Sequence, residues 1–402
     1  MVAHLIPEPA VRRSRPVLRP MEAGPVKVCF ISPLGYGLYR PESGVPFGGA
    51  EVQFFLLARA LSADPAFQVS VLTTVPADAG TERHGALTLV KRMGRSRLSS
   101  DGMGTLPGCW SAFTDMRRTL QAIDADVYLH AGAGVEVGAY ALICRILRRR
   151  FVFVVASSAD LADDPVRGPL RRMYPLGLRL ADAVVCRSEE QWGMLRRAYG
   201  LDGVVIRTGH PVPEDPGLSE TGKSVVLWVG RMHPLKQPGL FLDLAARLPK
   251  ERFVMVAFPD AAHDSLRAAI RRRGGEMPNV TLHEGVPWSE VGRVFAEAKL
   301  LVNTSLYEGF PNTFVQAAMQ GTPILSWSVD PDGVLTREGI GVWAAGSLER
   351  LAAAAEELCA SASLRVDLGR RARRYAEQHH DLGRSADALK ALVCRIVWQE
   401  AR

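Results

Sequence analysis

The sequence contains no uninterrupted apolar run of the roughly 18 to 20 residues that a membrane-spanning helix needs. Its most apolar stretches, such as FVFVVA and SVVLWV, have the length of β-strands and are soon interrupted. We therefore expect a protein that is not integral to a membrane. Residues 1–25 contain five prolines and no continuous apolar core, so they predict a flexible basic tail rather than a secretory signal, and we expect a cytoplasmic protein.

Clustered cysteines and nucleic-acid motifs are also lacking. The six cysteines stand singly, without CxxC or metal-ligand spacing, which indicates reduced thiols. Basic residues are not interleaved with aromatic ones and no helix-turn-helix, zinc or sheet-based RNA motif is present, so we expect no nucleic-acid partner. The formal net charge of +7 suits anionic partners such as nucleotide sugars, phospholipid headgroups or nucleic acid. The charge alone does not distinguish these from a solvated basic face.

Length and residue pattern together predict two domains. A chain of 402 residues exceeds the size at which one hydrophobic core stops growing. In the first half, β-branched runs alternate with amphipathic stretches, which predicts a parallel sheet with crossover helices. The expected strands are 26–32, 68–74, 126–130, 151–156 and 182–188, with helices near 50–62, 111–123 and 135–149.

The second half repeats this alternation after RTGHPVPEDPGLSETGK, whose prolines, glycines and polar residues predict a linker. Its expected strands are 224–230, 252–257, 279–284, 299–305 and 322–327, with helices near 238–248, 261–273, 288–297 and 312–320, and three more near 347–360, 363–378 and 383–399.

The fold class expected from this order is α/β, with two Rossmann-like domains whose parallel sheets face across a cleft and C-terminal helices packed outside. Ligands of open parallel sheets bind beyond the carboxyl ends of the strands, so strand-to-helix junctions matter most. The predicted segments are the tail 1–25, an N-terminal domain 26–208, a linker 209–223, a C-terminal domain 224–380 and a helix 381–402 that could cross back to the N-terminal domain.

Two junctions carry glycines or cations. Gly48 and Gly49 precede a helix, where backbone N–H groups could approach a phosphate, although two adjacent glycines alone are better explained by a loop that needs positive φ. In VLWVGRMHPLKQPG, Arg231 follows the strand-ending Gly230 and Lys236 stands just before the next helix. Two cations and a helix N-terminus on one loop suit a diphosphate, and the same spacing also occurs as solvated surface charge.

A third junction is LLVNTSLYEGFPNTFVQAAMQGTP, which reads as strand, turn and helix. Glu308 could accept hydrogen bonds from sugar hydroxyls, and Gln316, eight residues later, could bond a ribose. Each residue alone could equally be a capping acid or a semi-exposed polar side chain. The turn and the helix start, which offers unpaired N–H groups to a phosphate, consist of Gly309, Phe310, Pro311, Asn312 and Thr313.

Together, the EGFPNTFVQAAMQGTP run, the preceding VTLHEGVPWSEVGRVFAEAKLLVNTS and the GRMHPLKQP loop resemble the donor-binding half of the family-4 retaining glycosyltransferases of GT-B fold. The resemblance covers most of residues 224–380 and reaches the N-terminal half more loosely, through KVCFISP and the GGAE loop. The SVDPDGVLTREGIGV segment resembles the bacterial cell-surface polysaccharide branch, and its Asp330 and Asp332 could lie in a turn or bind a metal.

This resemblance implies roles for the residues of all three junctions. Arg231 and Lys236 would hold the diphosphate of a nucleotide diphosphate sugar and Glu308 would contact the transferred hexose, these three being the implied catalytic residues. The implied transfer retains the anomeric configuration and needs no cofactor and no metal. The implied donor-binding residues are Gly48, Gly49, Gly230, Gly309, Phe310, Pro311, Asn312, Thr313 and Gln316.

The sequence departs from the family pattern at two places. Gln316 replaces the second glutamate, which keeps an acceptor oxygen but loses the charge. The histidine that many relatives carry after a middle strand of the first domain is missing from the loop VVASSADLADD, which holds Ser158 and Asp160 instead. His130 is a candidate substitute, or alternatively a hydrogen-bonded structural histidine.

Arginines of the N-terminal half suit a saccharide or lipid-linked saccharide acceptor and peripheral contact with an anionic membrane, or simply a solvated face. A GT-B-shaped epimerase or phosphorylase and a catalytically silent sugar-nucleotide binding protein stay open as alternatives, and the sequence predicts no oligomeric state. The arginines concerned are Arg145, Arg148, Arg149, Arg150, Arg167, Arg171, Arg172 and Arg179.

Overall fold

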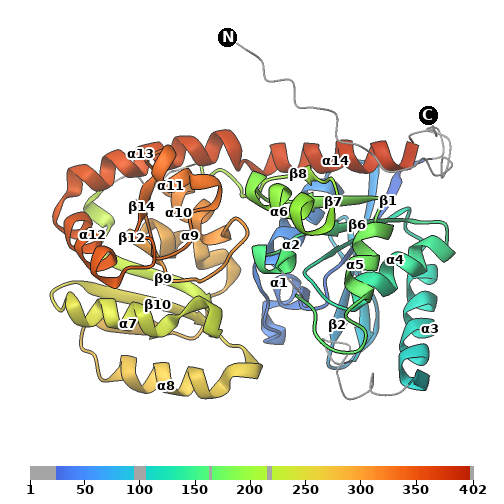
Figure 1. Cartoon of the computed structure of the whole chain (residues 1–402), viewed down its shortest axis with the longest axis horizontal. Helices are drawn as coiled ribbons and strands as arrows, with labels where there is room; N and C mark the ends of the chain where they lie inside the picture. The colour runs from blue at the N-terminus through green and yellow to red at the C-terminus, as the bar shows by residue number, and fades with distance from the viewer. Residues whose placement is uncertain (1–23, 95–105, 163–164, 215–219, 399–402) are drawn as a thin grey trace, which may run out of the picture. The chain divides into compact units, whose positions relative to one another are not determined.

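The computed structural model describes residues 24–94, 106–162, 165–214 and 220–398, so the predicted tail lies outside the described residues up to position 23. Contacts between Cα atoms divide the chain into two compact units. The first unit comprises Met1–Tyr39, Ala50–Arg207 and Ala386–Arg402, and the second comprises Arg40–Gly49 and Thr208–Ser385. Each unit is an α/β layer structure around its own sheet, as expected (Figure 1).

The sheet of the first unit has the strand order β3-β4-β2-β1-β5-β6-β7-β8. All of its strand pairs are parallel except β3 with β4, which form an antiparallel hairpin. The strands are β1 (Val26–Ile31), β2 (Phe67–Val75), β3 (Gly80–His84), β4 (Leu87–Met93), β5 (Val127–Ala131), β6 (Arg150–Val154), β7 (Ala183–Cys186) and β8 (Val204–Val205). The helices are α1 (Tyr36–Tyr39), α2 (Gly49–Ser62), α3 (Leu106–Ile123), α4 (Glu136–Ile146), α5 (Met173–Leu180) and α6 (Glu189–Tyr199).

One helix of this unit is shorter than the sequence predicts. The helix expected near 135–149 ends at Ile146, because Arg148 adopts a left-handed φ of 55° that a continuing helix does not allow, and β6 begins at Arg150. The core contains the fully buried side chains of Tyr128, Phe151 and Phe153. Cys29 and Cys186 are buried on strands β1 and β7, and burial raises the pKa of both thiols to about 12.

The sheet of the second unit has the order β11-β10-β9-β12-β13-β14, with parallel pairs throughout. The strands are β9 (Val225–Arg231), β10 (Arg252–Phe258), β11 (Val280–His283), β12 (Ala298–Asn303), β13 (Ile324–Ser326) and β14 (Gly341–Trp343). The helices are α7 (Pro238–Arg247), α8 (Asp264–Gly275), α9 (Trp288–Ala296), α10 (Asn312–Met319), α11 (Val334–Arg337), α12 (Leu348–Ala360) and α13 (Ala362–His379). They are followed by α14 (Leu382–Trp398), which only begins in this unit.

Helices cover both faces of this second sheet. Figure 1 shows α7 and α8 on one side of β9 and β10, and α9 and α10 on the other. Each face has its own apolar core, one including Phe241 and Leu242 of α7 and the other including Phe314 and Val315 of α10. Strands buried on both faces explain why their sequences are nearly continuous apolar runs.

The segment interpreted as a linker is packed where it begins. Thr208 and His210 are buried, and His210 forms an isolated parallel bridge with Asp381. The backbone N–H of His210 donates to the carbonyl oxygen of His380 over 2.9 Å, and the Nδ1 atom of His380 lies 2.7 Å from the carbonyl oxygen of Thr208. These bonds make residues 208–210 part of the second unit.

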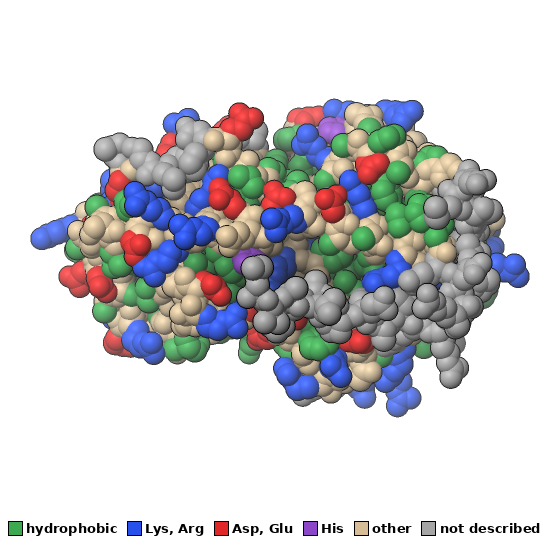
Figure 2. All heavy atoms as spheres, turned by 90° about the horizontal axis from the view of Figure 1, so that it is seen from above, with side chains coloured by type: hydrophobic (Ala, Val, Ile, Leu, Met, Phe, Trp, Pro, Cys, Tyr) green, Lys and Arg blue, Asp and Glu red, His purple; other side chains and the backbone are tan. Residues whose placement is uncertain are grey.

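The last helix, α14, begins in the second unit, and its residues from Ala386 onward belong to the first. Within the first unit, Lys390 of α14 pairs with Asp64 at 3.0 Å. On the face shown in Figure 2, basic side chains lie interspersed with acidic and apolar ones. None of the helices in the described part of the chain is long and apolar enough to cross a bilayer.

Candidate functional site

The loops that follow β9 and β12 lie at one edge of the second sheet. These two strands are parallel neighbours, so their carboxyl ends meet there. After β9 the chain forms a short 3-10 turn, Pro234–Lys236, and then α7. After β12 it forms an irregular loop and then α10. The topology thus brings together two junctions that are far apart in the sequence.

An ion pair connects these loops. The Nζ atom of Lys236 contacts Oε1 of Glu308, and the same oxygen accepts a hydrogen bond from Oγ of Ser305 at 2.7 Å. The two side chains are half-buried, with relative exposures of 27% for Lys236 and 15% for Glu308. A partly desolvated carboxylate with a fixed cation beside it is suited to binding hydroxyls and anionic oxygens.

A second set of contacts fixes the backbone on both sides of this pair. Oγ1 of Thr304 donates to the carbonyl oxygen of Lys236 over 2.6 Å and accepts from Nε1 of Trp228 over 2.9 Å. The backbone N–H of Leu306 donates to the carbonyl oxygen of Leu235 over 2.8 Å. The position of Lys236 therefore follows from strand β9 and from the loop after β12 together.

Arg231 is the last residue of β9 and is partly exposed. Its guanidinium forms no hydrogen bond or ion pair with a described residue, although its charge acts on the nearby imidazole of His233, as does that of Lys236. The preceding Gly230 leaves room for an indole, because a Cβ atom there would lie 2.9 Å from the Trp228 ring. Arg231 is thus available to an anion near the loop that carries Lys236.

The turn before α10 is buried, and Thr208 and His380 of the second unit contact it. Gly309, Phe310 and Pro311 are buried, and the ring of Phe310 lies 4.2 Å from that of His380. Oγ1 of Thr208 donates to the carbonyl oxygen of Phe310 over 3.3 Å. Helix α10 then begins with Asn312 and Thr313, and Pro311 supplies no side-chain cap. The N-terminus of α10 therefore has a fixed position.

Asn312 of the second unit contacts Gly49, one of the two glycines at the start of α2. Its Nδ2 atom donates to the carbonyl oxygen of Gly49 over 2.8 Å, and its Oδ1 lies 3.1 Å from Nε2 of His210. A Cβ atom on Gly49 would lie 2.8 Å from Asn312 Nδ2, and Gly49 has no left-handed φ. Close approach therefore explains this glycine better than backbone conformation does. Gly48 is buried beside it.

Gln316 lies on the second turn of α10 and is half-buried. Its side-chain amide makes no hydrogen bond with a described residue. It is thus placed as the sequence predicts, on the helix that starts at the Glu308 loop, and its binding role stays a prediction.

The three tentative residues lie in the first unit. His130 is buried on β5, with Nδ1 at 3.4 Å from the carbonyl oxygen of Ile31 and Nε2 at 3.9 Å from Oε1 of Glu136. Burial lowers the pKa of His130, and the charges of Glu136 and Glu51 oppose this shift. A neutral, buried imidazole next to a carboxylate is compatible with either open interpretation.

Asp160 caps its own loop. Its Oδ2 atom accepts the backbone N–H groups of Ala156 at 2.8 Å and Ser157 at 3.1 Å, while Ser157 caps the turn in return. Burial raises the pKa of Asp160, and these hydrogen bonds oppose the rise. Ser158, the first residue of this turn, is half-buried.

Asp330 likewise serves a turn, since it accepts from the N–H of Leu335 at 2.8 Å and from Oγ1 of Thr336 at 3.0 Å. Asp332 sits in the same turn with a left-handed φ of 56°. These contacts favour the turn interpretation of both aspartates over a metal site.

Two of the basic side chains expected on an acceptor surface have internal partners instead. Arg149 pairs with Asp124 and, at 3.5 Å, with Asp126, while the buried Arg150 lies 3.3 Å from Asp182. Arg150 starts β6 and Arg149 directly precedes it, and carboxylates at the starts of neighbouring strands hold both side chains. The exposed members of the set are Arg145, Arg148, Arg167, Arg171, Arg172 and Arg179.

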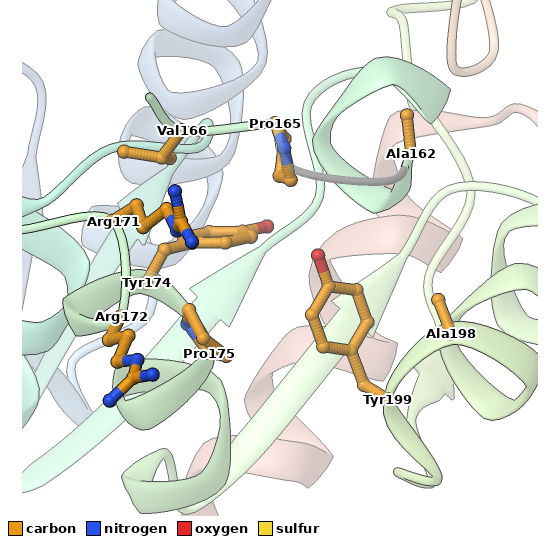
Figure 3. Close-up of a pocket in the computed structure, with 9 residues that line it drawn as sticks. All are labelled: Ala162, Pro165, Val166, Arg171, Arg172, Tyr174, Pro175, Ala198 and Tyr199. Atoms are coloured by element: carbon orange, nitrogen blue, oxygen red, sulfur yellow. The ribbon is translucent and has the colours of Figure 1, made fainter. Parts of the chain in front are cut away.

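Arg171 and Arg172 border a pocket of the first unit that has a volume of about 310 Å³. Figure 3 shows the rings of Tyr174 and Tyr199 in this pocket, which come from α5 and α6. The Tyr174 hydroxyl donates to the carbonyl oxygen of Asp160 over 2.8 Å. The pocket therefore combines fixed aromatic walls with two cationic side chains.

Several supporting residues were not predicted from the sequence. Thr304 and Ser305 belong to the quoted LLVNTS run, but nothing in a single serine or threonine indicates a contact across two loops. His210 lies in a segment whose prolines and glycines suggest a linker. Its burial depends on residues far along the chain, including its bridge with Asp381 and its hydrogen bond to Asn312.

Each half of the chain matches a known protein family. Residues 47–214 match the family described as Glycosyltransferase Family 4, and residues 223–361 match the family described as Glycosyl transferases group 1. The fold is also that of solved GT-B enzymes. Sucrose-phosphate synthase from Thermosynechococcus elongatus is 18% identical, with a TM-score of 0.74 over 92% of this chain and 99% of its own.

A second solved structure and one relative found by sequence extend the comparison. The trehalose-phosphate synthase (UDP-forming) from Burkholderia xenovorans, in complex with glucose-6-phosphate, is 13% identical, with a TM-score of 0.70 over 92% of this chain and 100% of its own. D-inositol 3-phosphate glycosyltransferase from Mycobacterium sp. (strain JLS) is 33% identical over 177 residues, which are 40% of this chain and 40% of that protein. The chain belongs to the family-4 type of GT-B glycosyltransferases.

Proposed function

We propose that the chain is a retaining glycosyltransferase that moves a hexose from a nucleotide diphosphate sugar to a saccharide or lipid-linked saccharide, in polysaccharide or glycoconjugate biosynthesis. The observation that carries the proposal is the Lys236–Glu308 ion pair, which connects the loops that follow the neighbouring strands β9 and β12. Helix α10 begins shortly after Glu308. Family membership supports the same reaction class.

In this proposal, Lys236 and Arg231 hold the donor diphosphate. Negative charge grows on that group as it leaves, and preorganised cations stabilise such charge most where water is partly excluded. Lys236 meets this condition because Thr304 fixes its backbone and Glu308 fixes its ammonium group. The two cations can supply this stabilisation without a metal ion.

Glu308 is the proposed contact to the transferred hexose. Its Oε1 atom already accepts a hydrogen bond from Ser305 and pairs with the ammonium group of Lys236. The Oε2 atom is left to accept hydrogen bonds from sugar hydroxyls. The N-terminus of α10 would face phosphate or sugar oxygens, and Gln316 on its second turn would bond the ribose. We assign no enzymic nucleophile and favour a front-face route in which the leaving phosphate helps to deprotonate the acceptor.

The acceptor is proposed to bind the N-terminal unit. Relatives are named for inositol 3-phosphate, and one neighbouring structure holds glucose-6-phosphate, so phosphorylated sugars are the first acceptors to test. The pocket bordered by Arg171 and Arg172 offers cations to such a group. A lipid-linked acceptor would bring the protein to the inner face of the membrane, and binding to anionic vesicles in a flotation assay at low salt tests that possibility directly.

Release of nucleoside diphosphate tests the proposal. The protein would be incubated with UDP-, GDP- or ADP-sugars, with and without a panel of phosphorylated and lipid-linked acceptors. Acceptor-dependent release, together with an α-linked product from an α-linked donor, supports retaining transfer. Conversion of the donor alone would instead support an epimerase, dependence on free phosphate a phosphorylase, and binding without any turnover a silent binding protein.

A further inference from the structure

A cluster of metal-ligating side chains lies beside the Lys236 loop and has no place in the proposed transfer reaction. His233 belongs to the loop after β9, and Asp260 and His263 belong to the loop after β10. The two strands are parallel neighbours, so their following loops meet at one edge of the sheet. One potential ligand atom from each of the three residues lies within 4.8 Å of the others.

We propose that His233, Asp260 and His263 bind one divalent transition-metal ion, with Zn²⁺ as the best match. Two imidazoles and one carboxylate are a common zinc ligand set, and they leave a fourth position for water. Among the described residues, this is the one group of three such side chains close enough to share an ion.

The distance between His263 and Asp260 already suits two ligands of a tetrahedral ion. Nδ1 of His263 lies 3.5 Å from Oδ2 of Asp260. Metal–ligand bonds of about 2.1 Å place two tetrahedral ligands roughly 3.4 Å apart. The imidazoles of His233 and His263 meet edge to face with their centroids 4.5 Å apart, so a small side-chain rotation brings the third ligand in.

The other polar atoms of the cluster hold it in place. Oδ1 of Asp260 accepts from the backbone N–H of Ala262 over 3.2 Å, which fixes the carboxylate and leaves Oδ2 toward His263. Nδ1 of His263 is buried and makes no hydrogen bond with any residue that the structure describes. A buried nitrogen without a donor or acceptor partner is costly, and a metal ion would satisfy it.

The site remains open to ions from solution, because the side chains of His263 and Asp260 are 29% and 12% exposed. Two features weaken it. Arg231 and Lys236 act on His233 with like charge, and Nδ1 of His233 accepts from the N–H of Leu235 at 3.1 Å as the cap of the turn that carries Lys236. We therefore expect metal binding to compete with this cap.

The test measures metal binding directly and does not depend on transferase activity. Chelator-treated full-length protein would be titrated with ZnSO4 by calorimetry, and with Co²⁺ by its visible absorption. We expect one equivalent to bind, tetrahedral Co²⁺ bands, and at least tenfold weaker binding in His263→Ala and Asp260→Asn. The matched control is His283→Ala, which removes an exposed histidine of β11 outside the cluster.

Thermal melts of each variant establish that folding is intact, and Asp260→Asn retains the shape of the side chain if His263→Ala does not fold. No stoichiometric binding by the unmodified protein would overturn the proposal. Equal affinity in the two cluster variants and in the control would also overturn it. A failure of sugar transfer would leave this measurement unaffected, so the two proposals fail separately.

Discussion

The Nζ atom of Lys236 meets Oε1 of Glu308 although the two residues are 72 positions apart. Other hydrogen bonds hold both partners of this ion pair in position. Thr304 bonds the backbone of Lys236, and Ser305 bonds the same carboxylate oxygen of Glu308. A donor diphosphate would have to share Lys236 with Glu308. Binding of the diphosphate and orientation of the sugar are therefore coupled in this account.

Gly49→Ala should disturb the contact with Asn312. The added Cβ would lie 2.8 Å from Nδ2, so the amide must move and its hydrogen bond to the Gly49 carbonyl is lost or lengthened. We expect a loss of about 1 kcal/mol in unfolding free energy, the usual value of one hydrogen bond, and weaker donor binding.

Chemical denaturation and nucleotide titration measure both effects. Gly275→Ala is the control, because a Cβ there meets nothing within 4 Å. In an Asn312→Ala background the Gly49 substitution should add little further loss. An equally large effect in that background would show that the clash with Asn312 is not the cause.

Gln316→Glu restores the acid of the family pattern on α10. If this side chain bonds a ribose, the carboxylate accepts the same hydroxyl more strongly, and donor affinity should be kept or improved. Calorimetric titration with the nucleotide sugar measures the change, with Gln378→Glu on an exposed position of α13 as the control. A loss beyond tenfold would mean that this position has another role.

Stability should fall in mild acid because of His210. Burial lowers its pKa from 6.5 to about 4, while its bond to Asn312 opposes the shift. Between these values the unfolded chain binds more protons than the folded one, so the unfolding free energy decreases as pH falls from 6.5 toward 4. The slope from one such group is at most about 1.4 kcal/mol per pH unit.

Urea denaturation at several pH values measures this slope. His210→Gln retains a side-chain donor for Asn312 but does not titrate in this range, so its slope should be smaller. Burial also lowers the pKa of His130, which leaves part of the slope in the variant. A slope identical to that of the unmodified protein would contradict the assignment, and His283→Gln at an exposed position is the control.

Arg171→Ala and Arg172→Ala should raise the KM for a phosphorylated acceptor at least fivefold, since hydrogen bonds to a charged group contribute about 1.5 to 3 kcal/mol. Donor binding should not change, because both residues lie in the first unit. Arg167→Ala, exposed on the same loop but not lining the pocket, is the control. An unchanged KM in both variants would place the acceptor elsewhere.

Much of the fold was predictable, because buried parallel strands leave nearly continuous apolar runs such as those of β6 and β9. Strand β3 was missed because its sequence, GTERH, contains no apolar residue; its antiparallel pairing with β4 is what defines it. Helices α5 and α6 were also missed, although Ser188 caps α6 and Gly200 ends it in the left-handed region, as helix signals prescribe.

For the candidate site, the sequence could place Lys236 and Glu308 at strand ends but not opposite each other. That meeting depends on β9 and β12 being neighbours, although β10 and β11 lie between them in the chain. The metal-ligating cluster depends on strand order in the same way, because His233 and His263 follow different strands. The sequence also did not reveal that Arg149 and Arg150 pair with carboxylates inside the first unit, because these partners lie elsewhere in the chain.

The most direct test of the account is transfer and donor binding by Lys236→Ala and Glu308→Ala. Both variants should lower transfer at least about a hundredfold, as removal of a preorganised electrostatic contact does, and Lys236→Ala should also abolish stabilisation by nucleoside diphosphates in thermal melts. Lys299→Ala, which breaks a 2.7 Å ion pair with Glu251 in the same unit, should leave both unchanged. Near-normal transfer by both folded variants would contradict the account.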